Sequence, residues 1–120
     1  MVMPWLFSKP FRKRHPQRVK EIKERFTTTY LTRESAAFER QLNANTHHDT
    51  RNKLGKIKIA TLILVGKDDE LTPLKMAEEL SAEIPDAKMI AFEQGGHGLY
   101  WEIPDLFNEA VLEFVNAQVE

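Results

Sequence analysis

The sequence contains no cysteine among its 120 residues. This absence excludes disulfide bonds, thiolate metal ligands and a cysteine nucleophile, so covalent chemistry would need another side chain. Serine is scarce as well, because Ser8, Ser35 and Ser81 are the only three and none lies in a Gly-x-Ser-x-Gly segment. The chain has only five glycines, and three of them lie in the short segment 95–98. A segment so rich in glycine is a turn candidate.

Long apolar runs are also missing. No run approaches the about 20 residues that a membrane-spanning helix requires. Residues 1–10 lack the basic-then-apolar order of a secretory signal. A chain of 120 residues that is 42 % hydrophobic can build one modest core. We therefore expect a cytoplasmic protein without a membrane partner.

The formal net charge of −1 conceals an uneven distribution. Residues 1–60 carry 14 Lys/Arg against 5 Asp/Glu, whereas residues 61–120 carry 3 against 13. A basic arm can indicate nucleic-acid binding. Here the basic residues are spread along helix-like segments without a pattern of interleaved aromatic and basic residues, so we expect no nucleic-acid partner. The two halves should instead attract each other, within one molecule or between two.

The first half of the chain reads as helical. Apolar residues at Val19, Ile22, Phe26 and Tyr30 are three or four positions apart, which predicts a helix over residues 16–30 with one apolar face. A second helix is predicted over about 33–43. Residues 43–51 are polar and read as a loop. Residues 53–59 then lead into the second half.

The second half alternates predicted strands and helices. The unbroken apolar run 61–65 suits a parallel strand covered on both faces. Thr72 is a good N-cap and Pro73 a good first helical residue, so a helix should run to about residue 83. A second strand is predicted over 88–92 and a last helix over about 104–117. This order predicts a short parallel β-α-β-α unit.

Two polar segments directly follow the predicted strands. The segment 66–73, Gly-Lys-Asp-Asp-Glu-Leu-Thr-Pro, follows the first, and Gly95-Gly96-His97-Gly98 follows the second. Open α/β sheets carry their chemistry at the carboxyl ends of their strands. An aspartate and His97 should therefore lie near each other, with Asp69 and Asp68 as the two candidates.

These motifs resemble the α/β-hydrolase fold family. Residues 53–119 look like the last two strands and helices of that fold, with Gly-x-x-Asp-x-x-Thr-Pro matched at 66–73 and Gly-His followed by Glu102-Ile103-Pro104 and Phe107. Within that family the chain resembles the branch of lactonases, esterases and haloperoxidase-like proteins, and is similar to 3-oxoadipate enol-lactonase. Residues 5–50 resemble the end of a helical cap. The resemblance implies a cap-like segment over 1–50 and the C-terminal core elements over 51–120.

The resemblance assigns two catalytic roles. His97 matches the general base, and Asp69 matches the carboxylate that orients it and stabilises its charged form. The spacing of the motif favours Asp69 over Asp68. The chain would thus supply two members of a Ser-Asp-His triad and no nucleophile. We expect no cofactor.

Two hypotheses follow for the function. In the first, the chain is a C-terminal segment of a serine hydrolase for carboxylic esters or lactones, inactive alone and completed by an N-terminal half. In the second, it is a non-catalytic interaction module derived from a hydrolase. Two strands alone leave edges and faces uncovered, so both hypotheses predict a homo-oligomer, with residues 43–51 as a hinge if segments are exchanged.

Two other features of the sequence carry less weight. His47-His48-Asp49 could suggest a metal site, but adjacent histidines do not easily point the same way and no further histidine or cysteine lies nearby. We therefore expect no metal.

The aromatic residues near the predicted site favour a core or an interface, with an acyl pocket as the alternative. These aromatic residues are Trp5, Phe7, Phe11, Tyr100 and Trp101.

Overall fold

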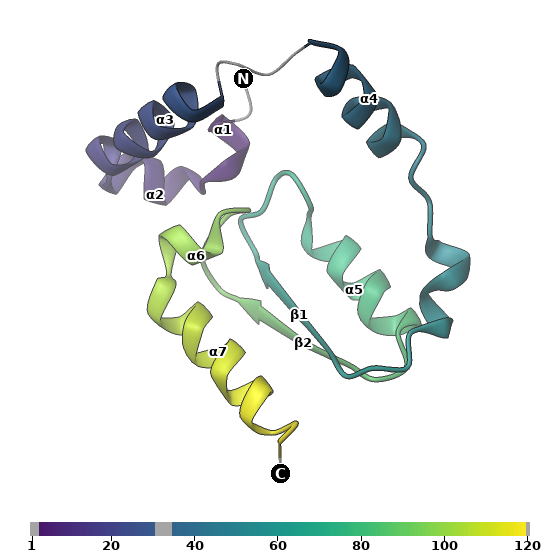
Figure 1. Ribbon diagram of the computed structural model, residues 1–120. Helices are drawn as coiled ribbons and strands as arrows, with labels where there is room; N and C mark the ends of the chain where they lie inside the picture. Colours follow the sequence, from purple (N-terminus) through teal and green to yellow (C-terminus); the bar gives the residue numbers. More distant parts are fainter. Residues whose placement is uncertain (1–2, 31–34, 120) are drawn as a thin grey trace.

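The computed structural model describes residues 3–30 and 35–119. Their elements, in chain order, are α1 (Met3–Leu6), α2 (Lys9–Arg14), α3 (Pro16–Tyr30), α4 (Ser35–Thr46), a 3₁₀ helix η1 (Arg51–Lys56), β1 (Thr61–Gly66), α5 (Leu74–Glu83), β2 (Ala87–Phe92), α6 (Leu99–Glu102) and α7 (Pro104–Asn116). Figure 1 shows the two strands at the centre, with α1 to α3 grouped near the carboxyl ends of the strands.

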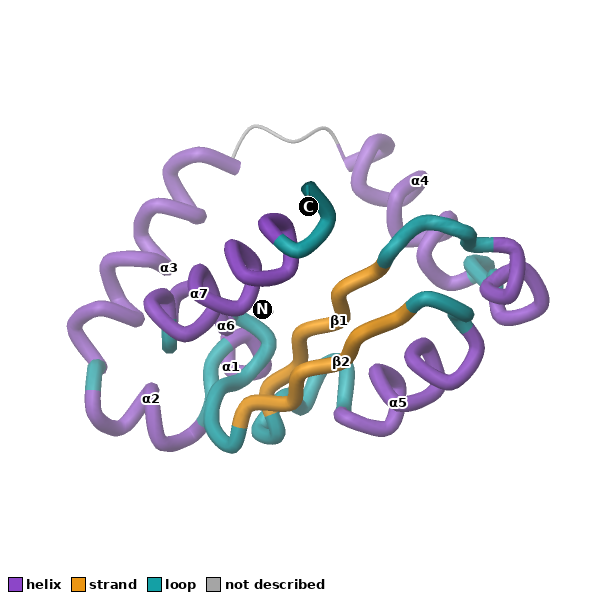
Figure 2. The backbone as a smooth tube through the Cα atoms, turned by 90° about the horizontal axis from the view of Figure 1, so that it is seen from below, coloured by secondary structure: helices purple, strands orange, loops and turns teal. Residues whose placement is uncertain are grey.

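The two strands form a parallel pair, as the sequence predicts. Thr61 pairs with Ala87 at the start of the register and Gly66 pairs with Phe92 at its end. Helices α5 and α7 lie on opposite sides of the strands in both views (Figures 1 and 2). Ala77 of α5 and Ala110 of α7 are buried where these helices contact the strands, and their small side chains allow a close approach. The structure therefore contains the short parallel β-α-β-α unit that the sequence predicts, with the carboxyl ends of both strands on one side.

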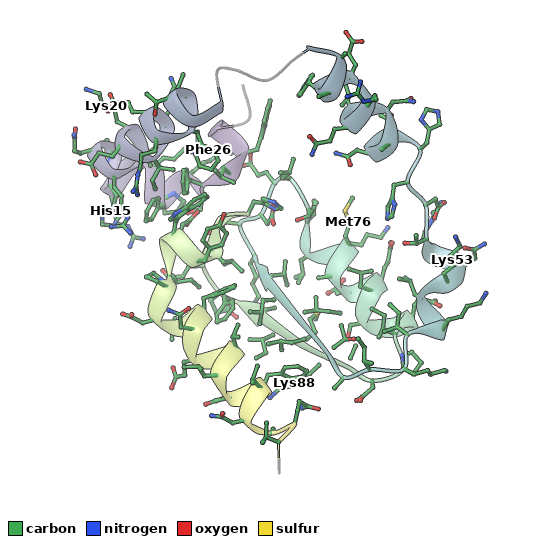
Figure 3. The ribbon with its side chains drawn as sticks, viewed as in Figure 1. His15, Lys20, Phe26, Lys53, Met76 and Lys88 are labelled. Carbon is green, nitrogen blue, oxygen red and sulfur yellow. The ribbon has the colours of Figure 1, made fainter. Side chains whose placement is uncertain are left out.

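The N-terminal helices pack through aromatic side chains. Phe7, Phe11 and Ile22 form a buried cluster, and Phe26 and Trp101 pack against it. The rings of Phe7 and Phe11 are stacked with centroids 5.4 Å apart, and Phe26 meets Trp101 edge to face at 5.6 Å. The side chains of Figure 3 place Phe26 on the inner side of α3, whereas Lys20 points outward. Phe7, Phe11 and Trp101 thus belong to a core, as the sequence favoured, whereas Trp5 and Tyr100 are about half exposed.

Several predicted boundaries differ from the structure. Helix α4 continues to Thr46, so residues 43–46 are helical rather than part of a loop, and η1 begins at Arg51. The predicted start of this helix at residue 33 lies outside the described residues. Helix α5 begins at Leu74 with Pro73 as its N-cap, one residue later than predicted. The short helix α6 is an element that the sequence did not predict.

Several large apolar side chains are exposed. All residues of α4 from 36 to 46 are exposed, including Phe38 at 55 % and Leu42 at 52 %. Leu80 of α5 is 39 % exposed as well. Among the described residues, no helix combines the length and the apolar character needed to cross a membrane.

Candidate active site

Asp69 lies in the loop that follows β1 and is buried, with only 8 % of its surface exposed. One oxygen, Oδ1, accepts hydrogen bonds from the backbone N–H groups of Leu71 at 2.8 Å and Thr72 at 2.9 Å. The other oxygen, Oδ2, accepts one from the Thr72 hydroxyl at 2.9 Å. These contacts fix the carboxylate plane. Asp68 has an exposed side chain, and its backbone N–H donates to the carbonyl of Gly95 at 3.2 Å.

His97 lies in the turn that follows β2 and meets Asp69 beyond the carboxyl ends of the two strands. Its Nδ1 lies 3.0 Å from Oδ2 of Asp69 and 3.1 Å from the Thr72 hydroxyl oxygen. The His97 side chain is 38 % exposed, whereas the Asp69 side chain is 6 % exposed. The structure therefore brings Asp69 and His97 together, and it places Asp68 outside this contact.

The charges decide which nitrogen of His97 carries the proton. Burial alone would raise the pKa of Asp69, but the hydrogen bonds from Thr72, His97 and Leu71 outweigh it and lower the pKa below the ordinary 3.8. At neutral pH the carboxylate is therefore ionised and can only accept hydrogen bonds. Because it faces Nδ1, that nitrogen must carry the proton. In the neutral ring Nε2 is then a free acceptor.

Thr72 has a role that its sequence position alone did not reveal. The sequence predicts it as the N-cap of α5, yet Pro73 takes that place, and no side-chain capping hydrogen bond is formed. Instead the Thr72 hydroxyl donates to Asp69, so that its lone pairs face the Nδ1–H of His97. The threonine thus holds the carboxylate and completes the surroundings of the histidine proton. In the sequence, only the Thr-Pro pair at the end of the motif indicates that Thr72 has a part in the site.

Glycines allow the two loops to approach each other. A Cβ atom on Gly66 would lie 2.0 Å from the carbonyl oxygen of Gly95, far inside van der Waals contact. Gly95 has φ +110°, a conformation that residues with a side chain rarely adopt. A side chain on Gly66 would therefore push the segment bearing Asp69 away from the segment bearing His97.

An open hollow of about 1080 Å³ lies beside the pair. Its lining combines an apolar floor with the polar segment 48–51, and Asp69, Thr72 and His97 border it as well. Met76 of α5 also lines it and points towards the open side in Figure 3. The apolar floor is made by Ile63, Leu64 and Val65 of β1 and Ala77 and Leu80 of α5. The hollow could hold a small apolar molecule or a further piece of polypeptide.

Over residues 3–30 and 35–119, no three His, Asp or Glu side chains gather as a potential metal site. The ring of His47 contacts the carbonyl of Asn43 at 2.8 Å, while Asp49 accepts from Arg51 Nε at 3.0 Å. Hydrogen bonds from Arg51 hold the pKa of the Asp49 carboxyl well below its usual range. These side chains are therefore bound to local partners rather than directed at a common point.

Two residues near His97 take part in contacts that the sequence did not predict. Glu102 accepts hydrogen bonds from the backbone N–H of Gly96 at 3.1 Å and from the backbone N–H of Ser8 at 2.7 Å. Ser8 precedes Glu102 by 94 residues. Local patterning cannot reveal a pair so distant along the chain.

The family of the chain follows from a comparison with known proteins. Residues 11–104 match the model of the alpha/beta hydrolase fold. The chain belongs to the α/β-hydrolase fold family. The match includes both strands, Asp69 and His97.

Relatives in this family are hydrolases of considerably greater length. The chain is 40 % identical over 67 residues to a 2-hydroxy-6-oxo-6-phenylhexa-2,4-dienoate hydrolase of Burkholderia cepacia, which covers 56 % of this chain and 23 % of the relative. It is 32 % identical over 79 residues to the putative carbamate hydrolase RutD of Pseudomonas savastanoi pv. phaseolicola, and this match covers 66 % of this chain and 30 % of the relative. The match thus spans about a quarter of each relative.

Solved structures of this family share the same arrangement. An α/β-hydrolase enzyme, MGS-M2, from a Medee basin deep-sea metagenome library superposes with a TM-score of 0.78 at 26 % identity, covering 95 % of this chain and 42 % of that one. An esterase from Exiguobacterium antarcticum superposes with a TM-score of 0.74 at 27 % identity, and the match covers 81 % of this chain and 36 % of the esterase. The arrangement of helices and strands found in these hydrolases therefore extends over nearly all of this chain.

Proposed function

We propose that this chain supplies the histidine and aspartate of a serine-hydrolase site for carboxylic esters or lactones. The observation that carries the proposal is the buried Asp69 carboxylate, which is held by Thr72 and Leu71 and meets Nδ1 of His97 at 3.0 Å. This is the geometry in which a carboxylate orients a histidine and stabilises its charged form.

The proposed chemistry uses the free Nε2 of His97. This nitrogen accepts the proton of a serine hydroxyl while the serine oxygen attacks the carbonyl carbon of the substrate. The imidazolium, stabilised by Asp69, then returns the proton to the leaving alkoxide, which departs as an alcohol. A water molecule attacks the acyl-serine by the same route and releases the acid, so that both catalytic groups are restored.

We propose that the serine lies outside these 120 residues. Ser8 is 4 % exposed, and its hydroxyl donates to Glu102 Oε2 at 2.7 Å and accepts from the Phe11 N–H at 3.2 Å. Ser81 lies near the C-terminal end of α5, whereas Asp69 and His97 lie beyond the opposite end of that helix. Without a nucleophile, the pair cannot form an acyl-enzyme.

The hollow beside β1 is the place where a complementary segment would dock. In the two-stranded sheet β1 pairs with β2 along one edge and has no described strand along the other. The apolar floor continues from this edge across α5. A parallel strand added at this edge would cover the floor and bring its carboxyl end, where the nucleophile is expected, towards His97. In this division residues 1–50 form the cap-like segment and residues 51–120 the core elements.

The test is reconstitution. The chain alone should hydrolyse p-nitrophenyl acetate no faster than free imidazole does. Mixing it with the part of the MGS-M2 hydrolase that it does not cover should produce burst kinetics, since an acyl-enzyme then accumulates. A lactone and a 2-hydroxy-6-oxodienoate, the substrate class in the names of two relatives, extend the assay. A burst from the chain alone would contradict the proposal.

A second candidate function is a non-catalytic, self-associating module. Phe38 and Leu42 of α4 are more than half exposed, and Ile59 is 75 % exposed. Contact between copies of the chain would cover such surfaces, helped by the opposite charges of the two halves. Light scattering at micromolar concentration should then show a dimer or larger assembly. A stable monomer of 13.9 kDa would exclude this function. Added salt should weaken the assembly modestly if the charges contribute.

A further inference from the structure

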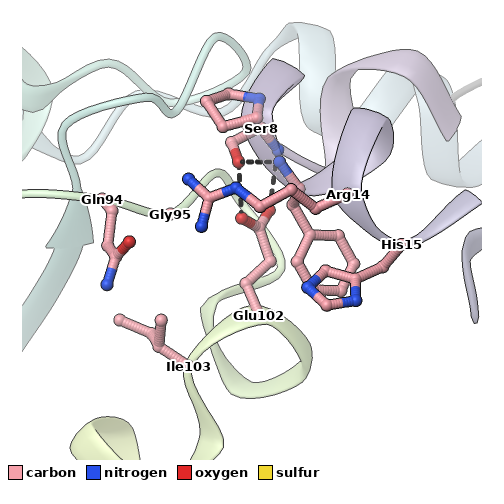
Figure 4. A pocket seen from close by; sticks show the side chains of 9 residues that line it. Ser8, Arg14, His15, Gln94, Gly95, Glu102 and Ile103 are labelled. Carbon is pink, nitrogen blue, oxygen red and sulfur yellow. Dashed lines mark hydrogen bonds between the residues drawn. The ribbon is translucent and has the colours of Figure 1, made fainter.

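The carboxylate of Glu102 joins two segments that are distant in the sequence. Oε1 accepts hydrogen bonds from the backbone N–H of Gly96 at 3.1 Å and of Ser8 at 2.7 Å. Oε2 accepts one from the Ser8 hydroxyl at 2.7 Å. Figure 4 shows Glu102 reaching from α6 to Ser8 at the start of α2, beside a small pocket of about 160 Å³. One side chain thus binds both the N-terminal helices and the residue that directly precedes His97.

The backbone contacts around this carboxylate are close on both sides of His97. A Cβ atom on Gly96 would lie 2.6 Å from the backbone nitrogen of Ser8. On the other side, the N–H of Gly98 donates to the carbonyl of Leu6 at 2.7 Å. His97 is therefore flanked by two residues that each touch the segment 6–8 directly.

The surroundings make this contact specific. Ser8 is also the N-cap of α2, and its hydroxyl accepts a hydrogen bond from the N–H of Phe11. Phe7 is 2 % exposed and packs against Trp101, with ring centroids 5.7 Å apart, next to Glu102 in the sequence. By contrast, the ion pair between Lys9 and Glu70 is exposed and adds little. Apolar packing and charge-assisted hydrogen bonds thus hold the same two segments together.

We propose that Glu102 is a positioning residue that fastens the turn bearing His97 to the N-terminal helices through Ser8, so that the placement of His97 depends on the docking of residues 6–14. Glu102 does not touch the imidazole and acts through Gly96. If the hydrolase function proposed above is correct, this contact makes the alignment of the base depend on the cap-like segment. The contact itself, however, can be tested without any activity.

The test is NMR of the full 120-residue chain with ¹⁵N-labelled histidine and backbone. In the unchanged protein the two ring nitrogens of His97 should give well-separated signals, one protonated and one free. In Ser8→Ala, the Gly96 bond to Glu102 is left in place. If the contact transmits position, the separation of the two His97 signals should nevertheless decrease towards that of a free imidazole. The Gly96 N–H should also exchange with solvent at least about tenfold faster, the order expected for a weakened charge-assisted bond.

Variants at Glu102 test the other side of the contact. Glu102→Ala should decrease the separation of the two His97 signals and speed the exchange of the Gly96 N–H more than Ser8→Ala does. Glu102→Gln keeps an oxygen for the two N–H groups and should restore most of the Gly96 protection and of the His97 signal separation. The matched control is Glu109→Ala on the exposed face of α7, which should change neither.

The outcomes separate this inference from the proposed function. Unchanged His97 signals and Gly96 exchange in folded Ser8→Ala would overturn the inference, whether or not hydrolysis can be reconstituted. If Glu102→Ala does not fold, Ser8→Ala and Glu102→Gln still decide the question. The expected shifts together with a failed reconstitution would support Glu102 as the link and contradict the hydrolase proposal alone.

Discussion

Replacing Gly66 by alanine should separate the two loops of the candidate site. The new Cβ atom would lie 2.0 Å from the carbonyl oxygen and 2.6 Å from the carbonyl carbon of Gly95, and 2.9 Å from a methyl of Leu99. The backbone atoms cannot yield by rotation, so the loops must move apart by about 1 Å or more to reach ordinary contact. That movement would break the hydrogen bond from Asp68 N–H to Gly95, which spans 3.2 Å.

The expected cost combines these two effects. Overpacking of this kind costs about 1–3 kcal/mol, and a lost hydrogen bond adds about 1 kcal/mol, so the free energy of unfolding should fall by about 2–4 kcal/mol. With a urea slope of about 1.5 kcal/mol/M, the midpoint of unfolding should fall by about 1–3 M. The displacement should also disturb the contact between Asp69 and His97.

Urea unfolding followed by circular dichroism measures this cost, with Gly55→Ala as the matched control. A Cβ atom on Gly55 meets only the carbonyl oxygen of Glu83 at 3.9 Å, so this substitution should be nearly neutral. If the midpoint of Gly66→Ala lies within about 0.3 M of that control, a difference typical of an unconstrained surface position, the close approach of the two loops is refuted.

Two further predictions concern the carboxylate. Thr72→Val removes the hydroxyl that binds Asp69 while keeping the shape, and urea unfolding should show a loss of about 1 kcal/mol that Thr72→Ser largely restores. Equal stability of Thr72→Val and the unchanged protein would contradict that contact. Because the pKa of Asp69 is lowered below 3.8, its ionised form stabilises the fold above that pH, and this contribution is lost as the pH falls through the folded-state pKa. The difference in unfolding free energy between the protein and Asp69→Asn should therefore decrease between about pH 6 and about pH 2, and a constant difference would count against the assignment.

The sequence predicts the core unit well where local chemistry determines the structure. The apolar run 61–65 with the glycine that follows it predicts a strand and its end, and the helical spacing of 104–117 predicts a helix. The structure contains both elements. The family resemblance implies that Asp69 and His97 lie at the same end of the sheet. In the structure Nδ1 of His97 lies 3.0 Å from Oδ2 of Asp69. Both residues follow strands that are parallel neighbours, so their meeting was accessible to sequence reasoning.

The features that the sequence did not predict depend on contacts between distant residues or on fine local geometry. The four-residue helix α6 is too short to produce a periodic signal, yet it carries Glu102 to Ser8. Thr72 satisfies the rules for an N-cap, but the carboxylate of Asp69 competes for its hydroxyl. The end of α4 is predicted too early because its last residues are exposed and mostly polar, so they have no apolar face to mark a helix.

The most direct test of the central claim compares three variants in the reconstituted mixture with p-nitrophenyl acetate as substrate. Asp69→Asn and His97→Ala should each lower kcat by about 10³-fold or more, because one removes the group that orients and stabilises the imidazole and the other removes the base. Asp68→Asn should leave kcat within about threefold, since the Asp68 side chain is exposed and only its backbone N–H makes the contact with Gly95. A mixture in which Asp69→Asn retains full activity while Asp68→Asn loses it would contradict the account.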